Sequence, residues 1–336
     1  MPKLAPVPVI AFGLGPIGRR IAAAALAEPR LELVGAVDLD PSLVGRPLAE
    51  LLDPGDDDHG PTPITVASSL TAVLDALPDP RPAELTVLHA TGSFLDRVGR
   101  QLLDLLAAGV HVVSTCEELA YPWLEHAALA SQLDAAATTQ QRTIVGTGVN
   151  PGLLMDQLPV TLTAASHSIR AITVTRRQDP SRRRIPFQRK VGMNITDEEW
   201  ERLDAEGGFG HVGLGQSGRL LAAGLGWSVR RWSGFHEAVQ PDPAGLVLGV
   251  RQTLRGETDD GRTLELVFEA HTEVTQDLDE IVVDGTPPLR MQFVGGVAGD
   301  DATAAAVLRA ARVLPSAPRG LITVLDLPLR ARPRVG

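Results

Sequence analysis

Hydrophobic residues in the first half of the chain fall into short apolar blocks, separated by longer stretches with helical spacing. The blocks have the pattern of buried parallel strands and are Val7–Phe12, Leu31–Val37, 85–89, His111–Ser114 and Thr143–Gly146. The helical stretches are 19–27, 47–52, 69–77, 94–108 and 121–139. This alternation predicts a parallel sheet with helices on both faces, which is the doubly wound Rossmann type of α/β fold.

The pattern changes after residue 150. Residues 264–274 partly alternate apolar and polar side chains, and 169–176 and 280–283 also have strand character, as in an open, mainly antiparallel sheet. Helical periodicity returns at 302–314, before a short apolar block at 322–325. We therefore predict a dinucleotide-binding domain of residues 1–150, onto which 302–336 packs back, and a substrate-binding and dimerisation domain of residues 151–301.

A glycine-rich turn joins the first strand to the first helix. Its residues are Gly13, Leu14, Gly15, Pro16, Ile17 and Gly18. Gly13 would allow the tight turn, Gly15 would let the backbone approach a pyrophosphate, and Gly18 would let the helix pack closely on the strand. In this strand–turn–helix context, with free N–H groups at the start of the helix, the turn predicts a dinucleotide cofactor.

An acidic residue ends the second strand, where such folds bind the adenosine ribose. The Asp38 carboxylate would accept hydrogen bonds from both ribose hydroxyls and repel a 2′-phosphate, which favours NAD over NADP. Arg19 and Arg46 leave NADP possible. A later strand ends at the sheet edge where doubly wound folds bind ligands, and the residues there are Ala90, Thr91 and Gly92.

The composition is that of a folded globular protein. With a net charge of −10, 21% charged residues and 44% hydrophobic residues, the chain is not expected to bind nucleic acid generally. No apolar run approaches the roughly 18 residues of a membrane span, and the first residues lack the layout of a signal peptide, so we expect a cytoplasmic location. One cysteine and no Cys/His cluster predict neither an intrachain disulfide nor a metal site.

Two neighbouring carboxylates, Glu117 and Glu118, follow the strand His111–Ser114 at the edge where the cofactor is expected. A glutamate there can act as a general acid or base during hydride-transfer chemistry. Alternatively, both carboxylates cap a helix that starts near Leu119 and complement its dipole. Spacing alone leaves both interpretations open. The adjacent Cys116 is interpreted as a packed thiol.

Several segments together resemble a known enzyme family. They are GLGPIG, HATGSFL, VVSTCEELAYPW, GTGVNPGLLMD, RRIPFQRKVG, GHVGLGQS and GGVAGDDAT. Over almost the whole chain they are similar to native amine dehydrogenases and 2,4-diaminopentanoate dehydrogenases, which are related to dihydrodipicolinate reductases. The first segment is generic, but STCEEL, GVNPGLLMD and GHVGLGQS in this order are specific.

The resemblance implies a Rossmann domain joined to an α/β domain with an open sheet, usually in a homodimer. It also implies NAD(P)H-dependent reductive amination, in which a small or medium ketone or aldehyde and ammonia give a primary amine, and the reverse oxidative deamination. The glutamate credited with catalysis in the family matches Glu117 best. Its carboxylate would take a proton from ammonium and assist the loss of water from the carbinolamine before hydride transfer.

Further residues are candidates for the substrate site, either at the domain crossing, near the glutamates, or as proton relays. They are Asn150, which would also contact the cofactor, Pro151, Gly152, Tyr121, His211 and His271. Residues 150–152 also have the composition of an interdomain turn. The glycine-dense segment 207–215 is either a lid or a tight connection between helices.

One cluster of arginines could clamp a substrate carboxylate, and its members are Arg176, Arg177, Arg182, Arg183 and Arg184. The alternative is a solvated loop whose arginines pair with the acidic surface. A clamp would favour an amino-acid or diamino-acid dehydrogenase over an amine dehydrogenase acting on a neutral carbonyl compound. A third possibility is a non-catalytic dinucleotide-binding protein, against which the intact glycine turn and Glu117 argue.

Overall fold

The fold is described from a computed structural model that covers residues 5–52, 62–207, 209–239 and 245–329. The chain divides into two compact units, one of residues 1–149 and 299–336 and the other of residues 150–298. The predicted boundaries, after residues 150 and 301, lie close to these. None of the described helices is long and apolar enough to cross a membrane.

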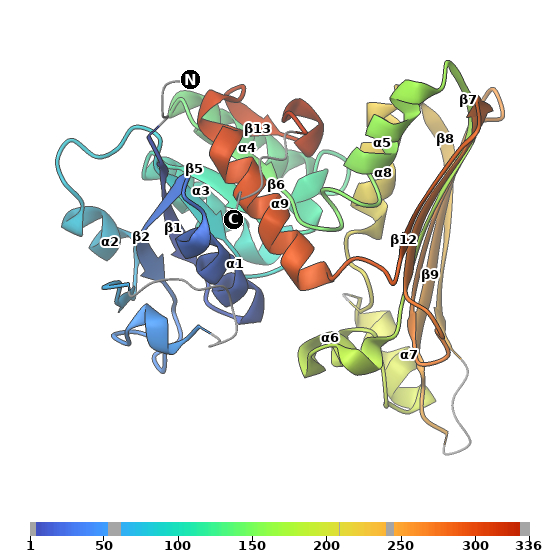
Figure 1. The fold of residues 1–336 in the computed structure, drawn as a ribbon, viewed down its shortest axis with the longest axis horizontal. Coiled ribbons are helices and arrows are strands. Elements are labelled where there is room, and N and C mark those ends of the chain that lie inside the picture. Colours follow the sequence, from blue (N-terminus) through green and yellow to red (C-terminus); the bar gives the residue numbers. More distant parts are fainter. Residues whose placement is uncertain (1–4, 53–61, 208, 240–244, 330–336) are drawn as a thin grey trace. The chain divides into compact units, whose positions relative to one another are not determined.

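The first unit contains a seven-stranded sheet in which all neighbouring strands are parallel, in the order β13-β6-β5-β4-β1-β2-β3 (Figure 1). The strands are β1 (Val7–Phe12), β2 (Leu31–Val37), β3 (Val66–Ala67), β4 (Thr86–His89), β5 (His111–Ser114), β6 (Thr143–Gly146) and β13 (Gly320–Ile322). The helices are α1 (Pro16–Ala27), α2 (Leu70–Ala76), α3 (Leu95–Ala107), α4 (Ala127–Thr139) and α9 (Gly299–Val313). The predicted doubly wound sheet is confirmed.

Alternate residues of the central strand β1 face two different helix layers. Ile10 and Phe12 pack into the large core formed with α2, α3 and α4. Ala11 packs against Ala22 and Ala23 of α1, where small side chains let the helix lie close to the sheet. The C-terminal part of the chain completes this unit, because α9 packs beside α1 and β13 pairs with β6.

The second unit contains a six-stranded sheet in the order β12-β11-β7-β10-β9-β8. Its strands are β7 (Ser168–Gln178), β8 (Val229–Ala238), β9 (Gly249–Thr258), β10 (Thr263–His271), β11 (Leu278–Thr286) and β12 (Leu289–Val294). The β7–β10 pair is parallel and the others are antiparallel, so the predicted open, mainly antiparallel sheet is confirmed. The helices are α5 (Gln157–Leu162), α6 (Ile185–Lys190), α7 (Asp197–Glu206) and α8 (Leu214–Gly224).

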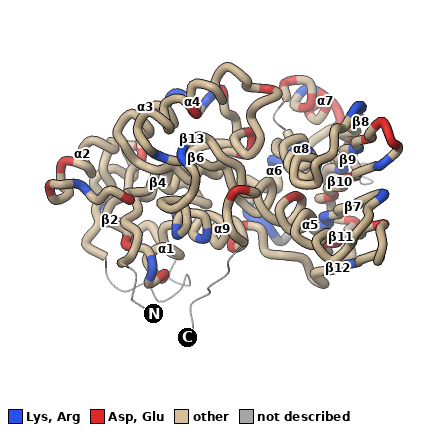
Figure 2. Tube along the Cα trace, turned by 90° about the horizontal axis from the view of Figure 1, so that it is seen from above, with Lys and Arg blue, Asp and Glu red and all other residues tan. Residues whose placement is uncertain are grey.

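The two faces of this sheet differ. Leu264, Leu266 and Phe268 of β10 belong to the core on the face that α5 and α8 cover (Figure 1). Among the described elements, no helix covers the opposite face, which we call the open face. Arginine and glutamate side chains pair across the strands there. Figure 2 marks the positions of acidic and basic residues along the chain.

Two predicted helices are shorter than expected. Residues 47–52 form only the 3-10 turn Leu48–Glu50, and α4 begins at Ala127 rather than near residue 121. The reason at the second position is Pro122, which lacks an N–H donor and disfavours a helical conformation at the preceding residue. Tyr121 accordingly has φ −151° and ψ 76°.

Candidate active site

The turn between β1 and α1 has the backbone geometry that a phosphate-binding turn requires. Gly13 has φ +91°, and a Cβ atom there would lie 2.7 Å from the carbonyl oxygen of Ala90. A Cβ atom at Gly18 would lie 1.8 Å from the carbonyl oxygen of Gly13, whereas one at Gly15 would meet nothing within 4 Å. The turn is therefore closely packed at both ends and open at Gly15, where a pyrophosphate can approach.

The start of α1 leaves backbone donors available. Pro16 is the first residue of the helix, and Gly15 provides no side-chain cap for the N–H groups of Ile17 and Gly18. Leu14 fixes the turn to the core of this unit, because its side chain is fully buried beside α1. These features fit the predicted phosphate site.

Asp38 fastens the glycine turn to the end of β2. Its Oδ2 accepts the N–H of Leu14 at 2.5 Å, and its Oδ1 accepts the N–H of Asp40 at 2.8 Å. Each carboxylate oxygen retains a second lone pair, so both can also accept ribose hydroxyls. Arg19 donates from Nε to the carbonyl oxygen of Leu14 at 2.8 Å, whereas Arg46 pairs with a neighbouring glutamate at 3.4 Å.

Residues 90–92 lie beside this turn, after strand β4. The strand order reverses between β4 and β1, which is where doubly wound sheets bind ligands. The N–H of Ala90 donates to the carbonyl oxygen of Phe12 at 2.8 Å. The methyl group of Thr91 would lie 2.8 Å from a Cβ atom at Gly13. Ala90 and Thr91 thus lie beside the glycine turn. We call Ala90, Thr91 and Gly92 the cofactor wall, and their contact with a dinucleotide stays a prediction.

The two neighbouring glutamates have different environments. Glu118 accepts the N–H of Leu95, the first residue of α3, at 2.6 Å and pairs with His126 Nε2 at 3.0 Å. The half-buried Glu117 instead accepts the hydroxyl of Ser93 at 2.9 Å. Glu118 therefore binds at a helix N-terminus, and the proton-transfer role expected of Glu117 stays a prediction.

The alternative in which both glutamates cap a helix near Leu119 is wrong. Only the 3-10 turn Glu118–Ala120 starts there, and the capped helix is α3, which follows the neighbouring strand β4. Loops that follow adjacent parallel strands meet at one edge of the sheet, so a carboxylate after β5 can reach a helix that begins after β4. The prediction that Cys116 is a packed thiol is confirmed, because it is buried and burial raises its pKa to about 12.

Two residues of this edge were not predicted from the sequence. Ser93 holds Glu117 through its hydroxyl and accepts the Cys116 thiol through its carbonyl oxygen at 3.2 Å. His89 forms hydrogen bonds with Ser114 and Thr91 from the end of β4. Their shared signal is a polar residue at or just after the end of a buried strand, which is where such folds place functional groups.

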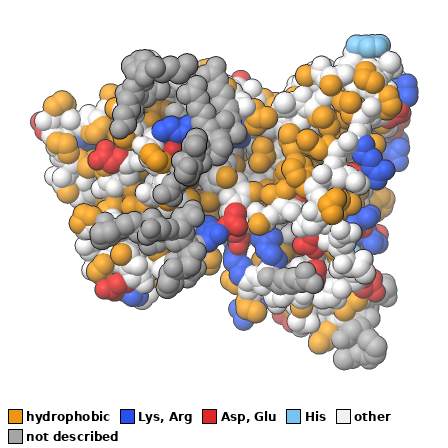
Figure 3. Space-filling view, viewed as in Figure 1, with side chains coloured by type: hydrophobic (Ala, Val, Ile, Leu, Met, Phe, Trp, Pro, Cys, Tyr) orange, Lys and Arg blue, Asp and Glu red, His pale blue; other side chains and the backbone are white. Residues whose placement is uncertain are grey.

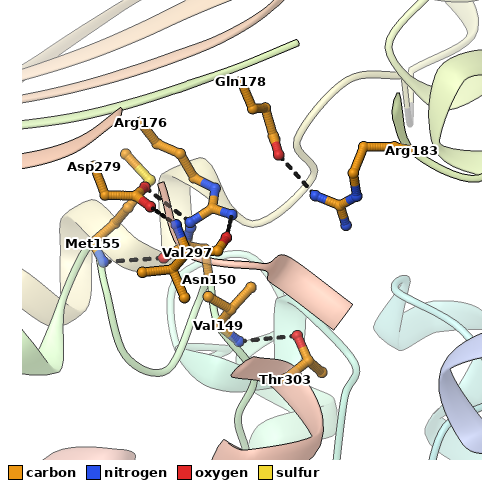
Figure 4. Close-up of polar contacts among 9 residues, drawn as sticks. All are labelled: Val149, Asn150, Met155, Arg176, Gln178, Arg183, Asp279, Val297 and Thr303. Carbon is orange, nitrogen blue, oxygen red and sulfur yellow. Dashed lines mark hydrogen bonds and ion pairs between the residues drawn. The ribbon is translucent and has the colours of Figure 1, made fainter. Parts of the chain in front are cut away.

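The residues at the start of the second unit form a turn fastened by two side chains. Asn150 accepts the N–H of Met155 at 3.0 Å through Oδ1 (Figure 4). The buried Asp156 accepts the N–H of Gly152 at 2.9 Å and the hydroxyl of Ser217 at 2.8 Å. Burial raises the pKa of Asp156. The turn interpretation is thus correct, and the cofactor contact of Asn150 and the substrate contact of Pro151 and Gly152 stay predictions.

The two histidines proposed as proton relays do not face one site. His211 packs against Phe268 with ring centroids 5.1 Å apart, on the helix-covered face of the sheet. His271 lies three positions after Phe268 in β10, and alternation along a strand places it on the opposite face. Both ring nitrogens of His271 are buried without a hydrogen-bond partner among the described residues, and burial lowers its pKa. The two histidines therefore lie on opposite faces of this sheet, and the role of each as a proton relay stays a prediction.

Tyr121 is half-buried and packs edge-on against Trp123, with ring centroids 5.1 Å apart. It lies in the same unit as Glu117, just after the 3-10 turn that follows it. Its predicted contact with the substrate stays a prediction. Within the described ranges, no group of histidine, cysteine and acidic side chains has the arrangement of a metal site.

The arginine cluster is divided between different environments. Arg176 is 4% exposed and donates to Asp279 at 2.9 Å and to the carbonyl oxygen of Val297 at 2.9 Å (Figure 4). Arg177 points to the open face, where it pairs with Glu269. The interpretation of the whole cluster as a solvated loop is therefore wrong, because alternation along β7 buries the first member.

The later members of the cluster lie on the segment after β7. Arg183 donates to Gln178 at 2.8 Å (Figure 4). Its guanidinium lies over the Phe187 ring at 4.7 Å. The Arg182 side chain lies outside the described residues. On the face shown in Figure 3, basic and acidic side chains lie next to one another at several places. Whether Arg183 binds a substrate carboxylate stays a prediction.

The glycine-dense segment is anchored on both sides of Gly208, which itself lies outside the described residues. The N–H of Gly210 donates to the carbonyl oxygen of Lys190 at 2.7 Å, and that of His211 donates to Gln252 at 2.6 Å. Phe209 packs against the buried Trp200, with ring centroids 5.7 Å apart. These contacts favour a tight connection between α7 and α8 over a lid.

Sequence comparisons relate the chain to known enzymes. Residues 153–333 match the family model of the 2,4-diaminopentanoate dehydrogenase C-terminal domain. The chain is also 27% identical over 343 residues to the 2,4-diaminopentanoate dehydrogenase of Acetoanaerobium sticklandii, covering 96% of this chain and 94% of that one. This similarity supports the prediction of an enzyme over the non-catalytic alternative.

Solved structures share the fold. The structure of an amine dehydrogenase from Mycobacterium smegmatis matches with a TM-score of 0.82 and 23% identity, covering 97% of each chain. The WlbA dehydrogenase from Bordetella pertussis, in complex with NADH and UDP-GlcNAcA, matches with a TM-score of 0.54 and 16% identity, covering 88% of this chain and 80% of that one. Together the comparisons confirm the expected fold class and the dehydrogenase assignment.

Proposed function

The chain belongs to the 2,4-diaminopentanoate dehydrogenase family, defined by the C-terminal domain that its residues 153–333 match, and from this premise we propose a reaction. The protein catalyses NAD(P)H-dependent reductive amination of a small or medium ketone or aldehyde. The balanced reaction converts the carbonyl compound, ammonium and NAD(P)H into a primary amine, NAD(P)⁺ and water. The reverse reaction is oxidative deamination.

The observation that carries this proposal is the separation of the two glutamates. Glu118 accepts the N–H of Leu95 and pairs with His126, whereas Glu117 accepts the Ser93 hydroxyl at the edge of the sheet, and we assign proton transfer to Glu117. In the amination direction its carboxylate takes a proton from ammonium, so that neutral ammonia attacks the carbonyl carbon. It then returns a proton to the departing hydroxyl of the carbinolamine, which gives the imine. The cofactor supplies the hydride that reduces the imine carbon.

The proposal can be tested by identifying the product. We expect the protein, NADH, ¹⁵N-ammonium and a panel of ketones and aldehydes to yield a primary amine that carries the label, as detected by mass spectrometry. An alcohol as the only product, formed equally without ammonium, would instead identify a carbonyl reductase.

A diamino-acid substrate is the second candidate, because Arg183 is oriented by Gln178 and Phe187 as a possible carboxylate partner. A guanidinium can bind a carboxylate through two parallel hydrogen bonds. This alternative predicts reduction of NAD⁺ with 2,4-diaminopentanoate, the compound named in the relative from Acetoanaerobium sticklandii. It also predicts that the matching amine without a carboxylate is a poor substrate.

We propose that NAD is preferred because of Asp38. Asp38→Ser is expected to raise the KM for NADH by about tenfold and to reduce the preference over NADPH, since a charge-assisted hydrogen bond contributes about 1.5–3 kcal/mol. Steady-state kinetics with both cofactors measure this change. Asp40→Ser is the matched control, because Asp40 is exposed and accepts the N–H of Ser42 rather than that of the glycine turn. Equal changes in the two variants would contradict the role of Asp38.

We further propose that two copies of the chain associate through the open face of the second unit. Neutral half-buried side chains lie on this face, and they are Thr173, Thr175, Val267 and Val282. Its arginines pair with glutamates of the same chain, as Arg251 does with Glu269 at 2.8 Å and Arg290 with Glu280 at 2.7 Å. An identical face would therefore meet no excess of like charge, as a two-fold symmetric interface requires.

A charge at the centre of this face should prevent association. Val267→Arg is expected to convert the dimer into a monomer, because it would bury an unpaired guanidinium in the interface. Size-exclusion chromatography with light scattering measures the mass. Ala135→Arg, at an exposed position of α4 in the first unit, is the control that should stay dimeric. A Val267→Arg protein with the mass of a dimer would contradict this interface.

A further inference from the structure

A continuous chain of hydrogen bonds crosses the sheet edge between the predicted cofactor wall and the glutamate loop. At its centre is His89, which is 1% exposed. Its Nδ1 lies 2.8 Å from Ser114 Oγ, which also accepts the N–H of Cys116 at 3.0 Å. Its Nε2 lies 2.8 Å from Gln101 Oε1 and 2.8 Å from Thr91 Oγ1, and Thr91 donates to Gln101 at 2.7 Å.

The partners determine which nitrogen of His89 carries the proton. A neutral imidazole has one ring hydrogen, so the nitrogen that faces an obligate acceptor carries it, and the other nitrogen, here Nδ1, accepts the Ser114 hydroxyl. Gln101 Oε1 can only accept, so Nε2 must be the donor. Burial lowers the pKa of His89 to about 4, which keeps the imidazole neutral near pH 7. Every donor in the chain therefore has an acceptor.

The two ends of this chain reach the two halves of the proposed active site. Thr91 contacts Gly13 of the glycine turn with its methyl group while its hydroxyl belongs to the chain. At the other end, Cys116 directly precedes Glu117. Nδ1 of His89 is therefore connected to the segment that precedes Glu117, and Nε2 is connected to Thr91 beside the glycine turn.

We propose that His89 is a positioning residue that sets the cofactor wall and the Glu117 loop relative to each other, an inference that rests on the amination chemistry proposed above. Nδ1 holds the loop through Ser114, and Nε2 holds Thr91 and Gln101. Loss of the first contact affects proton transfer at Glu117, and loss of the second affects dinucleotide binding.

Two substitutions separate these contacts. An asparagine amide replaces Nδ1 of histidine in space, and a glutamine amide replaces Nε2. His89→Asn can accept from Ser114 but loses the contacts of Nε2, so the dissociation constant for NADH should rise about tenfold while kcat at saturating NADH changes by less than about twofold. His89→Gln keeps the Nε2 contacts and loses that of Nδ1, so kcat should fall about tenfold or more while NADH binding changes by less than about twofold.

The single cysteine provides a readout that does not need turnover. Cys116 is buried, and its thiol donates to the carbonyl oxygen of Ser93, so it should react slowly with 5,5′-dithiobis(2-nitrobenzoic acid). Loosening of the loop in His89→Gln should accelerate labelling about tenfold or more, whereas His89→Asn should react like the wild type. Ser114→Ala removes one hydroxyl and should reproduce the behaviour of His89→Gln, even if His89→Gln does not fold.

His111 offers a matched control. It is also 1% exposed with its pKa lowered by burial to about 4, and its Nδ1 accepts the N–H of Thr143 at 3.1 Å, but it lies at the opposite end of β5. His111→Asn should change neither NADH binding, nor kcat, nor labelling by more than about twofold.

Weaker NADH binding only in His89→Asn, together with faster labelling only in His89→Gln, would support the proposal. Parallel effects in both variants, or effects equal to those of His111→Asn, would overturn it. Absence of ammonium-dependent turnover in the wild type would contradict the amination reaction but would leave the binding and labelling results able to test His89.

Discussion

Glu117→Gln is expected to lower kcat for reductive amination by about 10²-fold or more, because a positioned general acid or base contributes roughly 10²- to 10⁴-fold. Glutamine preserves the shape of the side chain and can accept the Ser93 hydroxyl, but it cannot take a proton from ammonium. NADH binding should stay close to that of the wild type. Stopped-flow measurement of NADH oxidation at saturating ammonium and ketone separates this chemical step from product release.

Glu118→Gln is the matched control for that experiment. The neighbouring carboxylate accepts the N–H of Leu95 and pairs with His126, so its replacement should weaken the start of α3 by about 1 kcal/mol. We expect a lower melting temperature and a kcat within about threefold of the wild type. Retention of more than about a tenth of the activity in Glu117→Gln, or a larger loss in Glu118→Gln, would contradict the assignment of the two roles.

The second large effect is a loss of stability in mild acid. Burial lowers the pKa values of both His89 and His111 to about 4, against 6.5 in the unfolded chain. The unfolded state therefore binds more protons between these values, and stability falls as the pH decreases from 6.5 towards 4. At pH 4.5 each histidine should cost about 2–3 kcal/mol, which is a large part of the roughly 5–15 kcal/mol that stabilises a typical domain.

Urea unfolding followed by circular dichroism at pH 7.0 and pH 4.5 measures this loss. His111→Asn removes one titrating group and keeps an acceptor for the Thr143 N–H, so it should recover about 2–3 kcal/mol of the acid-dependent change. Equal unfolding free energies at the two pH values in the wild type would show that these histidines are not held neutral.

Much of the fold could be predicted because hydrophobic periodicity is local. The buried parallel strands of the first unit are continuous apolar blocks, and α3 has a clear apolar face. Strands β8, β9 and β12 were missed for the opposite reason. β8 is VRRWSGFHEA and β9 is GVRQTLRGET, and each contains glycine and several arginines because its open face is not buried against helices.

The candidate site was predictable where a short segment contains the whole signal. The glycine turn with Asp38 and the glutamate pair after β5 are segments of this kind. The spacing of Glu117 and Glu118 did not distinguish their environments, because their contacts come from another loop, with Glu118 at Leu95 and Glu117 at Ser93.

Within each unit, other hydrogen bonds join residues that are still further apart in the sequence. His89 meets Ser114 across two neighbouring strands, and the motifs GVNPGLLMD and GHVGLGQS meet where Asp156 accepts the Ser217 hydroxyl. Arg176 and Arg177 are adjacent in sequence but lie on opposite faces of β7, so a cluster of arginines in sequence did not make a cluster in space.

The most direct test of the proposed function is the ammonium dependence of NADH oxidation by the wild-type protein. We predict that a ketone or aldehyde from a panel supports NADH oxidation at pH 7–9 only when ammonium is present, with a rate that saturates in ammonium. Oxidation of NADH at the same rate without ammonium, or no oxidation with any carbonyl compound in its presence, would contradict reductive amination.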